Sequence, residues 1–212
     1  MSPIVQNPAS APGESFDRLL SAIRACTVCA GHLPLGPRPI VQLDPRARLM
    51  IVGQAPGLKV HQTGIPWNDA SGRMLRQWLD IDESVFHDAS RVAIMPMGFC
   101  YPGRGKGGDL PPRKECAPLW FDRVYTHLTR IELILLIGRY AQAWYLGKEQ
   151  KANLTRTVAA FAEYAPRYIP LVHPSPRNTA WMQRNPWFEQ DLLPVLRSRV
   201  AAVLDLPQGE TR

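Results

Sequence analysis

Four short, mostly apolar runs, each followed by a loop rich in glycine or proline, constrain the fold of this chain most strongly. The runs cover residues 49–52, 92–95, 133–137 and 168–172. Runs of this length are typical of strands buried on both faces, and residues with helical spacing lie between them. Strands that alternate with helices form parallel sheets covered on both faces. The sequence therefore predicts an α/β domain built on a parallel sheet.

The predicted helices are marked by apolar spacing and by capping residues. A first helix follows Ser15, and its apolar positions are Phe16, Leu19, Leu20 and Ile23. Asp69 or Ser71 is expected to cap the helix after the first strand, because a short polar side chain can accept a hydrogen bond from the first turn. Pro194 falls inside the last helical repeat and must kink or split that helix.

Length and composition favour one globular domain. The chain has 212 residues, of which 45% are hydrophobic, which is normal for a chain with a real core. We assign residues 15–205 to this domain, residues 1–14 to a flexible N-terminal tail and residues 206–212 to a C-terminal tail. No apolar run approaches eighteen residues and no secretory signal is visible, so we expect a cytoplasmic monomer without a membrane span.

The charge balance points to an anionic partner. Lysine and arginine number 25 against 18 aspartate and glutamate residues, which gives a net charge of +7. Basic surfaces attract polyanions, and the planar guanidinium group suits phosphate. Because many cytosolic proteins are mildly basic, charge alone makes a nucleic-acid partner only about twofold more probable.

Three unusual loops follow the predicted strands. They cover residues 53–69, 97–112 and 173–181, and are long and rich in glycine or proline. Ligands of open α/β sheets bind beyond the carboxyl ends of the strands. Proline-rich turns are the simpler interpretation, but loops this long in a small domain are more often functional.

Four cysteines form two spaced pairs. Two residues separate Cys26 from Cys29, and fifteen separate Cys100 from Cys116. Four thiols can complete a tetrahedral zinc site or hold an iron–sulfur cluster. Alternatively, the close pair is a redox motif and the other two are buried apolar residues. The spacing alone leaves zinc and iron–sulfur open.

Three short motifs occur in an order that resembles a known family. Residues 53–57 (Gly-Gln-Ala-Pro-Gly) are similar to its first signature motif, and residues 64–72 match a pattern with an aromatic residue and a later glycine. Residues 173–178 (His-Pro-Ser-Pro-Arg-Asn) are similar to its second signature motif. With the cysteine layout, the chain from Ser15 to the last helix resembles the uracil-DNA glycosylase superfamily, in particular its iron–sulfur branches, families four and five.

The resemblance implies a fold, a cofactor and a reaction. The fold is a three-layer α/β/α sandwich with a four-stranded parallel sheet. The cofactor is a [4Fe–4S] cluster that braces the loops near DNA. Its ligands are Cys26, Cys29, Cys100 and Cys116. The reaction is hydrolysis of the N-glycosidic bond of a flipped-out damaged base in DNA, with uracil as the expected base.

The chemistry of that reaction assigns roles to individual residues. Trp67 offers a face on which the base can stack, and His173 can donate to the departing base as it gains negative charge. Backbone N–H groups near Gln54 and Ala55 can assist. Gly53 and Gly57 allow the backbone to approach the substrate closely.

Basic and polar residues around these motifs are candidate DNA contacts. Ser175 suits a phosphate, and Arg177 stands where relatives place a residue that wedges into the minor groove. Arg104 and Lys106 belong to a basic stretch that continues to residues 113 and 114. A solvated loop is the simpler interpretation for any one of these positions.

Two departures from the family pattern affect the reaction. Many relatives carry a carboxylate in the first motif that orients the attacking water, whereas this chain has Gln54 and Ala55 there. Gln54 can hold a water as an amide, and Asp69 and His61 are the nearest alternative bases. Relatives often read the uracil edge with an asparagine before the third cysteine. Residues 95–99 lack one, and Asn68 is the candidate substitute.

Three functional hypotheses result. The first is a monofunctional DNA glycosylase with an iron–sulfur cluster. The second is a nucleic-acid-binding protein on the same fold that has lost catalysis, or has an altered specificity, as the two departures suggest. The third, a thiol redox protein using Cys26 and Cys29, leaves both signature loops unexplained.

Overall fold

The predicted parallel sheet is present in the computed structural model, which describes residues 13–206. Its strands are β1 (Leu49–Val52), β2 (Val92–Ile94), β5 (Leu133–Ile137) and β6 (Tyr168–Leu171). They lie in the order β2-β1-β5-β6, and each neighbouring pair is parallel. The central strands β1 and β5 are completely buried, as apolar strands covered on both faces should be.

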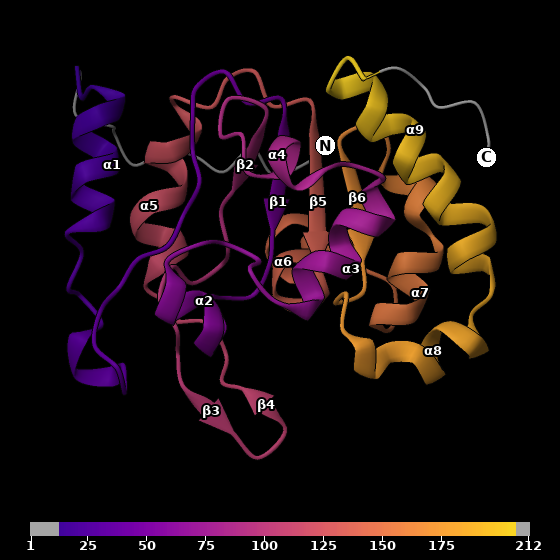
Figure 1. Ribbon diagram of the computed structural model, residues 1–212, viewed down its shortest axis with the longest axis horizontal. Helices are drawn as coiled ribbons and strands as arrows, with labels where there is room; N and C mark the ends of the chain where they lie inside the picture. The colour runs from indigo at the N-terminus through magenta and orange to yellow at the C-terminus, as the bar shows by residue number, and fades with distance from the viewer. Residues whose placement is uncertain (1–12, 207–212) are drawn as a thin grey trace.

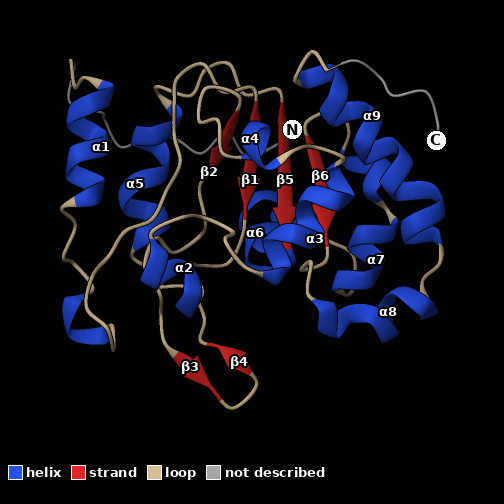
Figure 2. Ribbon diagram, in the orientation of Figure 1, coloured by secondary structure: helices blue, strands red, loops and turns tan. Residues whose placement is uncertain are grey.

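Helices cover both faces of this sheet, which confirms the predicted α/β/α sandwich (Figures 1 and 2). Successive side chains of a strand point to opposite faces. Met50 and Val52 pack in a core with α1 (Phe16–Arg24), α5 (Cys116–Tyr125) and α6 (Gly138–Leu146). Leu49 and Ile51 pack in the other core with α3 (Ala70–Leu79), α7 (Leu154–Ala159) and α9 (Leu193–Val203).

The two edges of the sheet are closed by different means. Beside β2, Gln42 forms an antiparallel bridge with Ile94, and each backbone N–H donates to the other residue's carbonyl, at 3.0 and 2.7 Å. At the other edge, β6 contains Pro170, which pairs in register with Leu136 of β5. Proline has no N–H, so it is tolerated on an edge strand where no further strand needs that donor.

The helix boundaries follow the predicted signals. Ser15 caps α1, and Asp69 rather than Ser71 caps α3, with Oδ1 accepting from the backbone N–H of Gly72 at 2.8 Å. Pro194 lies in the first turn of α9, and a π-helical turn, Phe188–Leu192, precedes it. The helical repeat that was predicted to be kinked or split at Pro194 therefore continues through this residue, with a π-helical turn immediately before α9.

Several shorter elements were not predicted. They are α2 (Leu58–Thr63), α4 (Glu83–Phe86), α8 (Thr179–Arg184) and the 3₁₀ turns Ala30–His32, Gly147–Glu149, Phe161–Tyr164 and Pro176–Asn178. The expected loop 97–112 also contains an antiparallel hairpin of β3 (Arg104–Gly105) and β4 (Gly108–Asp109). Gly103 and Gly108 have φ angles of 99° and 138°, which glycine adopts without steric cost.

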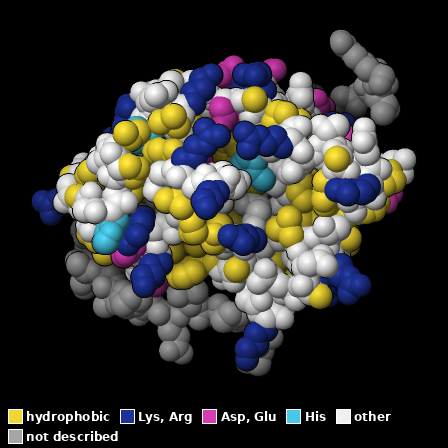
Figure 3. Space-filling model, turned by 90° about the horizontal axis from the view of Figure 1, so that it is seen from below, with side chains coloured by type: hydrophobic (Ala, Val, Ile, Leu, Met, Phe, Trp, Pro, Cys, Tyr) yellow, Lys and Arg dark blue, Asp and Glu magenta, His cyan; other side chains and the backbone are white. Residues whose placement is uncertain are grey.

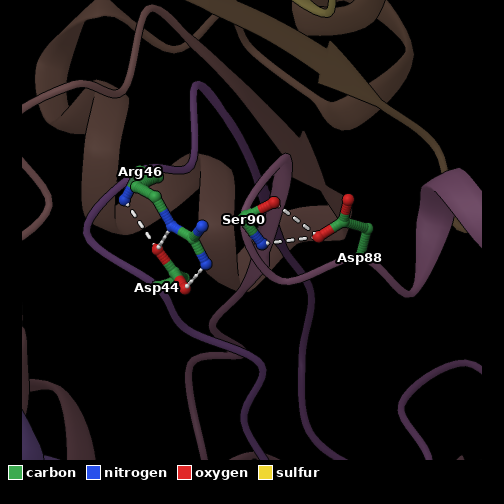
Figure 4. A network of polar contacts seen from close by, with 4 residues as sticks. All are labelled: Asp44, Arg46, Asp88 and Ser90. Carbon is green, nitrogen blue, oxygen red and sulfur yellow. Dashed lines mark hydrogen bonds and ion pairs between the residues drawn. The ribbon is translucent and has the colours of Figure 1, made fainter.

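Two short turns hold the edge of the sheet where β1 and β2 begin (Figure 4). Asp44 Oδ1 accepts from the backbone N–H and from Nε of Arg46, at 2.8 and 2.9 Å. Asp88 Oδ1 accepts from the backbone N–H and Oγ of Ser90, at 2.9 and 2.6 Å. The hydrogen-bonded Arg46 side chain lowers the pKa of Asp44, so this turn keeps its charged acceptor. Both strands therefore start from locally fixed backbone.

Residues 1–12 and 207–212, which hold most of the two predicted tails, lie outside the described part of the chain. Within residues 13–206, no helix is both long enough and apolar enough to cross a membrane.

Candidate active site

A cavity of about 200 Å³ opens at the carboxyl ends of the strands. This edge is the lower one in Figure 1, where α2 and the β3–β4 hairpin also lie. The cavity is smaller than the 300–1,000 Å³ typical of sites for drug-sized ligands, so it suits a single small ring. Its lining includes most of the predicted catalytic and base-binding residues and one predicted DNA contact, Gly57. The former are Gly53, Gln54, Ala55, Trp67, Asp69 and His173. Loops from three parts of the sequence thus meet at one site.

Trp67 forms one wall of this base-sized cavity, and two glycines make room for it. Its backbone has a φ of 55°, which is uncommon for a side chain of this size. The indole covers Gly53, where an added Cβ would lie 3.1 Å from Cζ2 of Trp67. At Gly72 an added Cβ would overlap the carbonyl oxygen of Trp67. Gly72 is therefore required by the turn that presents Trp67.

His173 lies beside Trp67, two residues after the end of β6. Its ring centroid is 5.8 Å from that of Trp67, with 33° between the planes. Its carbonyl oxygen accepts from the backbone N–H of Ser175 at 2.8 Å and from Nδ2 of Asn178 at 2.7 Å. These bonds fix the backbone and leave the imidazole at the cavity mouth.

Desolvation by the surrounding protein lowers the pKa of His173, although the nearby Asp69 and Asp109 oppose this shift. A lowered pKa makes the imidazole neutral near pH 7. A neutral imidazole still carries one N–H donor, so His173 can donate to an anionic group that forms beside it.

Gln54 and Asp69 are both partly committed to structural contacts. Nε2 of Gln54 donates to the carbonyl oxygen of Leu110 at 2.8 Å, which joins the first loop to the hairpin loop. One carboxylate oxygen of Asp69 caps α3. Both side chains line the cavity, but neither is free to act with all of its polar atoms.

Asp109 is a site residue that the sequence interpretation missed. It ends β4 and lines the cavity from the hairpin, and an added Cβ on Gly57 would lie 3.4 Å from its Oδ2. Desolvation raises the pKa of Asp109, while Arg104 and His173 lower it and Asp69 raises it further. The sequence did contain a signal for Asp109, because this residue lies in the loop after the second strand. The carboxyl ends of parallel strands share one edge of the sheet, where ligands bind.

Two other predicted site residues do not line the cavity. Asn68 follows Trp67 but is not part of the lining, so the structure gives no support to its role in reading the base. His61 also lies outside, where its ring contacts that of Tyr101 with centroids 6.0 Å apart. The structure therefore gives no support to His61 as the alternative base.

The candidate DNA contacts surround the cavity mouth. Arg104 and Lys106 are exposed on the β3–β4 hairpin, and Arg177 is exposed in the loop after His173. Ser175 Oγ accepts from the backbone N–H of Arg177 at 3.3 Å, so Ser175 also shapes that loop. Figure 3 views this edge of the molecule, and lysine and arginine side chains are spread around apolar patches across its centre.

The four cysteines meet at a separate, smaller cavity, which Arg113 also lines. All four are free thiols; Cys29, Cys100 and Cys116 are buried. Desolvation raises the pKa values of Cys100 and Cys116 to about 11, and neighbouring cysteines add to both shifts. These thiols are therefore neutral near pH 7, and a bound cation would favour their thiolate form.

The arrangement of the thiols bears on which metal group would fit. A zinc ion needs each sulfur about 2.3 Å from one point. Among the residues that the structure describes, no three His, Cys, Asp or Glu side chains form a group that could hold a metal ion. The four thiols line the small cavity without forming such a group.

A comparison with known protein families identifies the family of this chain. The family model described as the uracil DNA glycosylase superfamily matches residues 40–197. A solution NMR structure of a proposed uracil DNA glycosylase from Methanosarcina acetivorans is 15% identical, with a TM-score of 0.42; the match covers 76% of this chain and 97% of that one. The crystal structure of Pedobacter heparinus SMUG2 is 12% identical, with a TM-score of 0.34, over 76% of this chain and 74% of that one.

Proposed function

The chain belongs to the uracil DNA glycosylase superfamily, and from this membership we propose that it hydrolyses the N-glycosidic bond of a damaged base in DNA. Uracil is the expected base. The observation that carries the proposal is that Trp67, His173 and Asp109 line one base-sized cavity at the carboxyl edge of the sheet. An aromatic face, an N–H donor and a carboxylate are the groups that this hydrolysis needs.

The base would enter the cavity after leaving the duplex stack. Flipping costs a few kcal/mol, and stacking on an aromatic side chain returns about 1–3 kcal/mol per base. Trp67 provides that face, and Gly53 lets the ring and the base approach the backbone closely. Backbone groups of Gln54 and Ala55 and the hydroxyl of Ser71 are available to read the base edge.

Bond cleavage separates charge between the sugar and the base. Water adds to C1′, the N-glycosidic bond breaks, and its electron pair leaves with the base. His173 would donate a hydrogen bond to the base as negative charge develops on it. Asp109 would orient the water and accept its proton, and the charges of Asp109 and Asp69 would favour the positive charge that develops on the sugar.

We also propose that Cys26, Cys29, Cys100 and Cys116 hold an iron–sulfur cluster, which would place the protein in an iron–sulfur branch of the superfamily. All four cysteines are free and line the same small cavity, which supports this ligand set. When bound, the cluster would supply a structural link between the loop after α1, the loop after β2 and the first residue of α5. The chain's own side chains carry out hydrolysis.

A labelled oligonucleotide panel tests the reaction. Single- and double-stranded DNA containing uracil, hypoxanthine, xanthine or a thymine mispair would be incubated with the protein and then treated with alkali to reveal abasic sites. Cleavage at uracil is the expected result. Binding to all these DNAs without any abasic site would instead support the non-catalytic hypothesis. Binding affinity should fall with salt, by roughly one log-slope unit for each phosphate contact.

A further inference from the structure

A second hollow lies beside the base-sized cavity. This lateral groove has a volume of about 690 Å³, and its apolar lining includes Met97, Tyr140 and Trp144. Tyr140 and Trp144 belong to α6, which starts at the carboxyl end of β5. The Trp144 side chain is 42% exposed, although its edge contacts Phe121 within the protein. A large aromatic face is therefore open to solvent at the same edge of the sheet as the proposed active site.

The rim of the lateral groove is basic. Arg113 and Lys114 line it, and no aspartate or glutamate is found among its lining residues. Arg113 is paired with Glu115 at 2.5 Å, whereas Lys114 forms no ion pair within residues 13–206. Arg139 lies over the Tyr140 ring, 4.6 Å from its centroid. Aromatic faces flanked by cationic groups are what single-stranded nucleic acid binds, through stacked bases and paired phosphates.

The lateral groove and the base-sized cavity share a thin wall. Pro96 lines the cavity, and the next residue, Met97, lines the groove. A second pair of adjacent residues is divided in the same way, because Asp109 lines the cavity and Leu110 lines the groove. A strand with one base in the cavity would therefore pass close to the groove.

We propose that the lateral groove binds an unpaired nucleotide of the strand that carries the damaged base. Its base would stack on Trp144, and a phosphate would lie near Lys114. The inference rests on the proposed function, because DNA at the cavity brings that strand to the groove. It adds a second nucleotide site and predicts a preference for DNA that is unpaired beside the lesion.

Fluorescence of 2-aminopurine tests the stacking directly. This base analogue would be placed at successive positions of an undamaged single-stranded oligonucleotide, and the affinity would be measured by anisotropy. We expect quenching on binding at one or two positions. Trp144→Ala should remove the quenching and weaken binding roughly 5- to 150-fold, which corresponds to the loss of one stacked base. Trp144→Phe should retain most of the quenching and most of the affinity.

Two further variants separate the groove from general effects. Val195→Ala alters an apolar residue of similar exposure, 43%, on α9. It should change neither the quenching of 2-aminopurine nor the affinity for the oligonucleotide. Lys114→Glu should weaken binding and reduce its salt dependence. Equal single-strand affinity of wild type and Trp144→Ala, with both proteins folded, would overturn the proposal and leave an apolar protein partner as the better occupant.

The two proposals fail in different ways. If uracil is excised but Trp144 has no influence on single-stranded DNA, the groove assignment is wrong and the glycosylase assignment stands. If no lesion is excised but Trp144→Ala abolishes quenching, the groove binds nucleotides and the reaction is wrong.

Discussion

Gln54 and Leu110 are 56 positions apart, yet Nε2 of Gln54 donates to the Leu110 carbonyl oxygen at 2.8 Å. The bond joins the loop after β1 to the end of the β3–β4 hairpin. Asp109 immediately precedes the acceptor, so the bond fixes the backbone on which that carboxylate stands. Gln54 therefore helps to hold the Asp109 carboxylate in place, although the two residues are far apart in the sequence.

Gln54→Ala should therefore act through Asp109. Without the bond, the hairpin should open more often, and single-turnover excision should slow while the affinity for DNA changes little. Hydrogen exchange of residues 104–110 distinguishes this role from direct contact with water. Exchange that stays at the wild-type rate in a slow Gln54→Ala protein would show that Gln54 acts on the reacting groups themselves.

Asp109→Asn should lower the single-turnover rate about 10²–10⁴-fold, the range for loss of a general base. Asp69→Asn is the matched control. It lines the same cavity, but one of its oxygens serves as a helix cap, so we expect a smaller kinetic loss. Asparagine caps helices about as well as aspartate, so the melting temperature should change little. A greater rate loss in Asp69→Asn would assign the base to Asp69 instead.

The pH dependence of the rate should reflect the raised pKa of Asp109. The charged form accepts the proton, so activity should be present above that pKa and fall as the pH drops through it. The fall should begin at a higher pH than an ordinary aspartate would give. Asp109→Asn should remove this limb of the profile, and a limb that persists would have to come from another group.

His173→Ala should slow single-turnover excision about 10²–10³-fold, the effect of losing one donor to a developing anion. Affinity for DNA should be nearly unchanged, since that hydrogen bond strengthens only as charge develops. The lowered pKa of His173 means that its imidazole takes up a proton only at a lower pH than an ordinary histidine does, so any effect of that protonation on the rate should lie at a lower pH too. Equal losses of binding and rate would make His173 a binding residue.

Gly72→Ala should destabilise the protein although it lies in a helix, where alanine normally gains about 0.5–1 kcal/mol over glycine. Its Cβ would overlap the Trp67 carbonyl, and such overpacking costs about 1–3 kcal/mol. Gly31→Ala is the control, because nothing lies within 4 Å of its added Cβ. Thermal unfolding and tryptophan fluorescence would measure both; an unchanged Gly72→Ala protein would mean that the Trp67 turn adapts.

Purified protein should be brown and contain about four irons per chain, which absorbance and metal analysis would establish. Cys100→Ala should lose the iron and loosen the segment from 98 to 112. Ser175→Ala, which removes no thiol, should keep the colour. Colourless protein with stoichiometric zinc would contradict the cluster.

The strands and the two signature loops could be predicted because their signals are local. Four apolar runs identified the sheet, and the residues after β1 and β6 identified Trp67 and His173. Asp109 could not be placed in the same way, because its position depends on the hairpin and on the distant bond from Gln54. Asn68 shows a limit of the same reasoning: its neighbours Trp67 and Asp69 line the cavity but Asn68 does not, because successive side chains of a turn point in different directions.

The closed edges of the sheet also determine how this protein resists aggregation. An exposed edge strand can pair with a strand of another chain and begin a continuous intermolecular sheet. Here Gln42 occupies hydrogen-bonding positions of Ile94 beside β2, and Pro170 withholds a donor on β6. Both edge strands are thereby protected against pairing with a strand of another chain. The cavity and the groove at the carboxyl ends of the strands remain open to ligands.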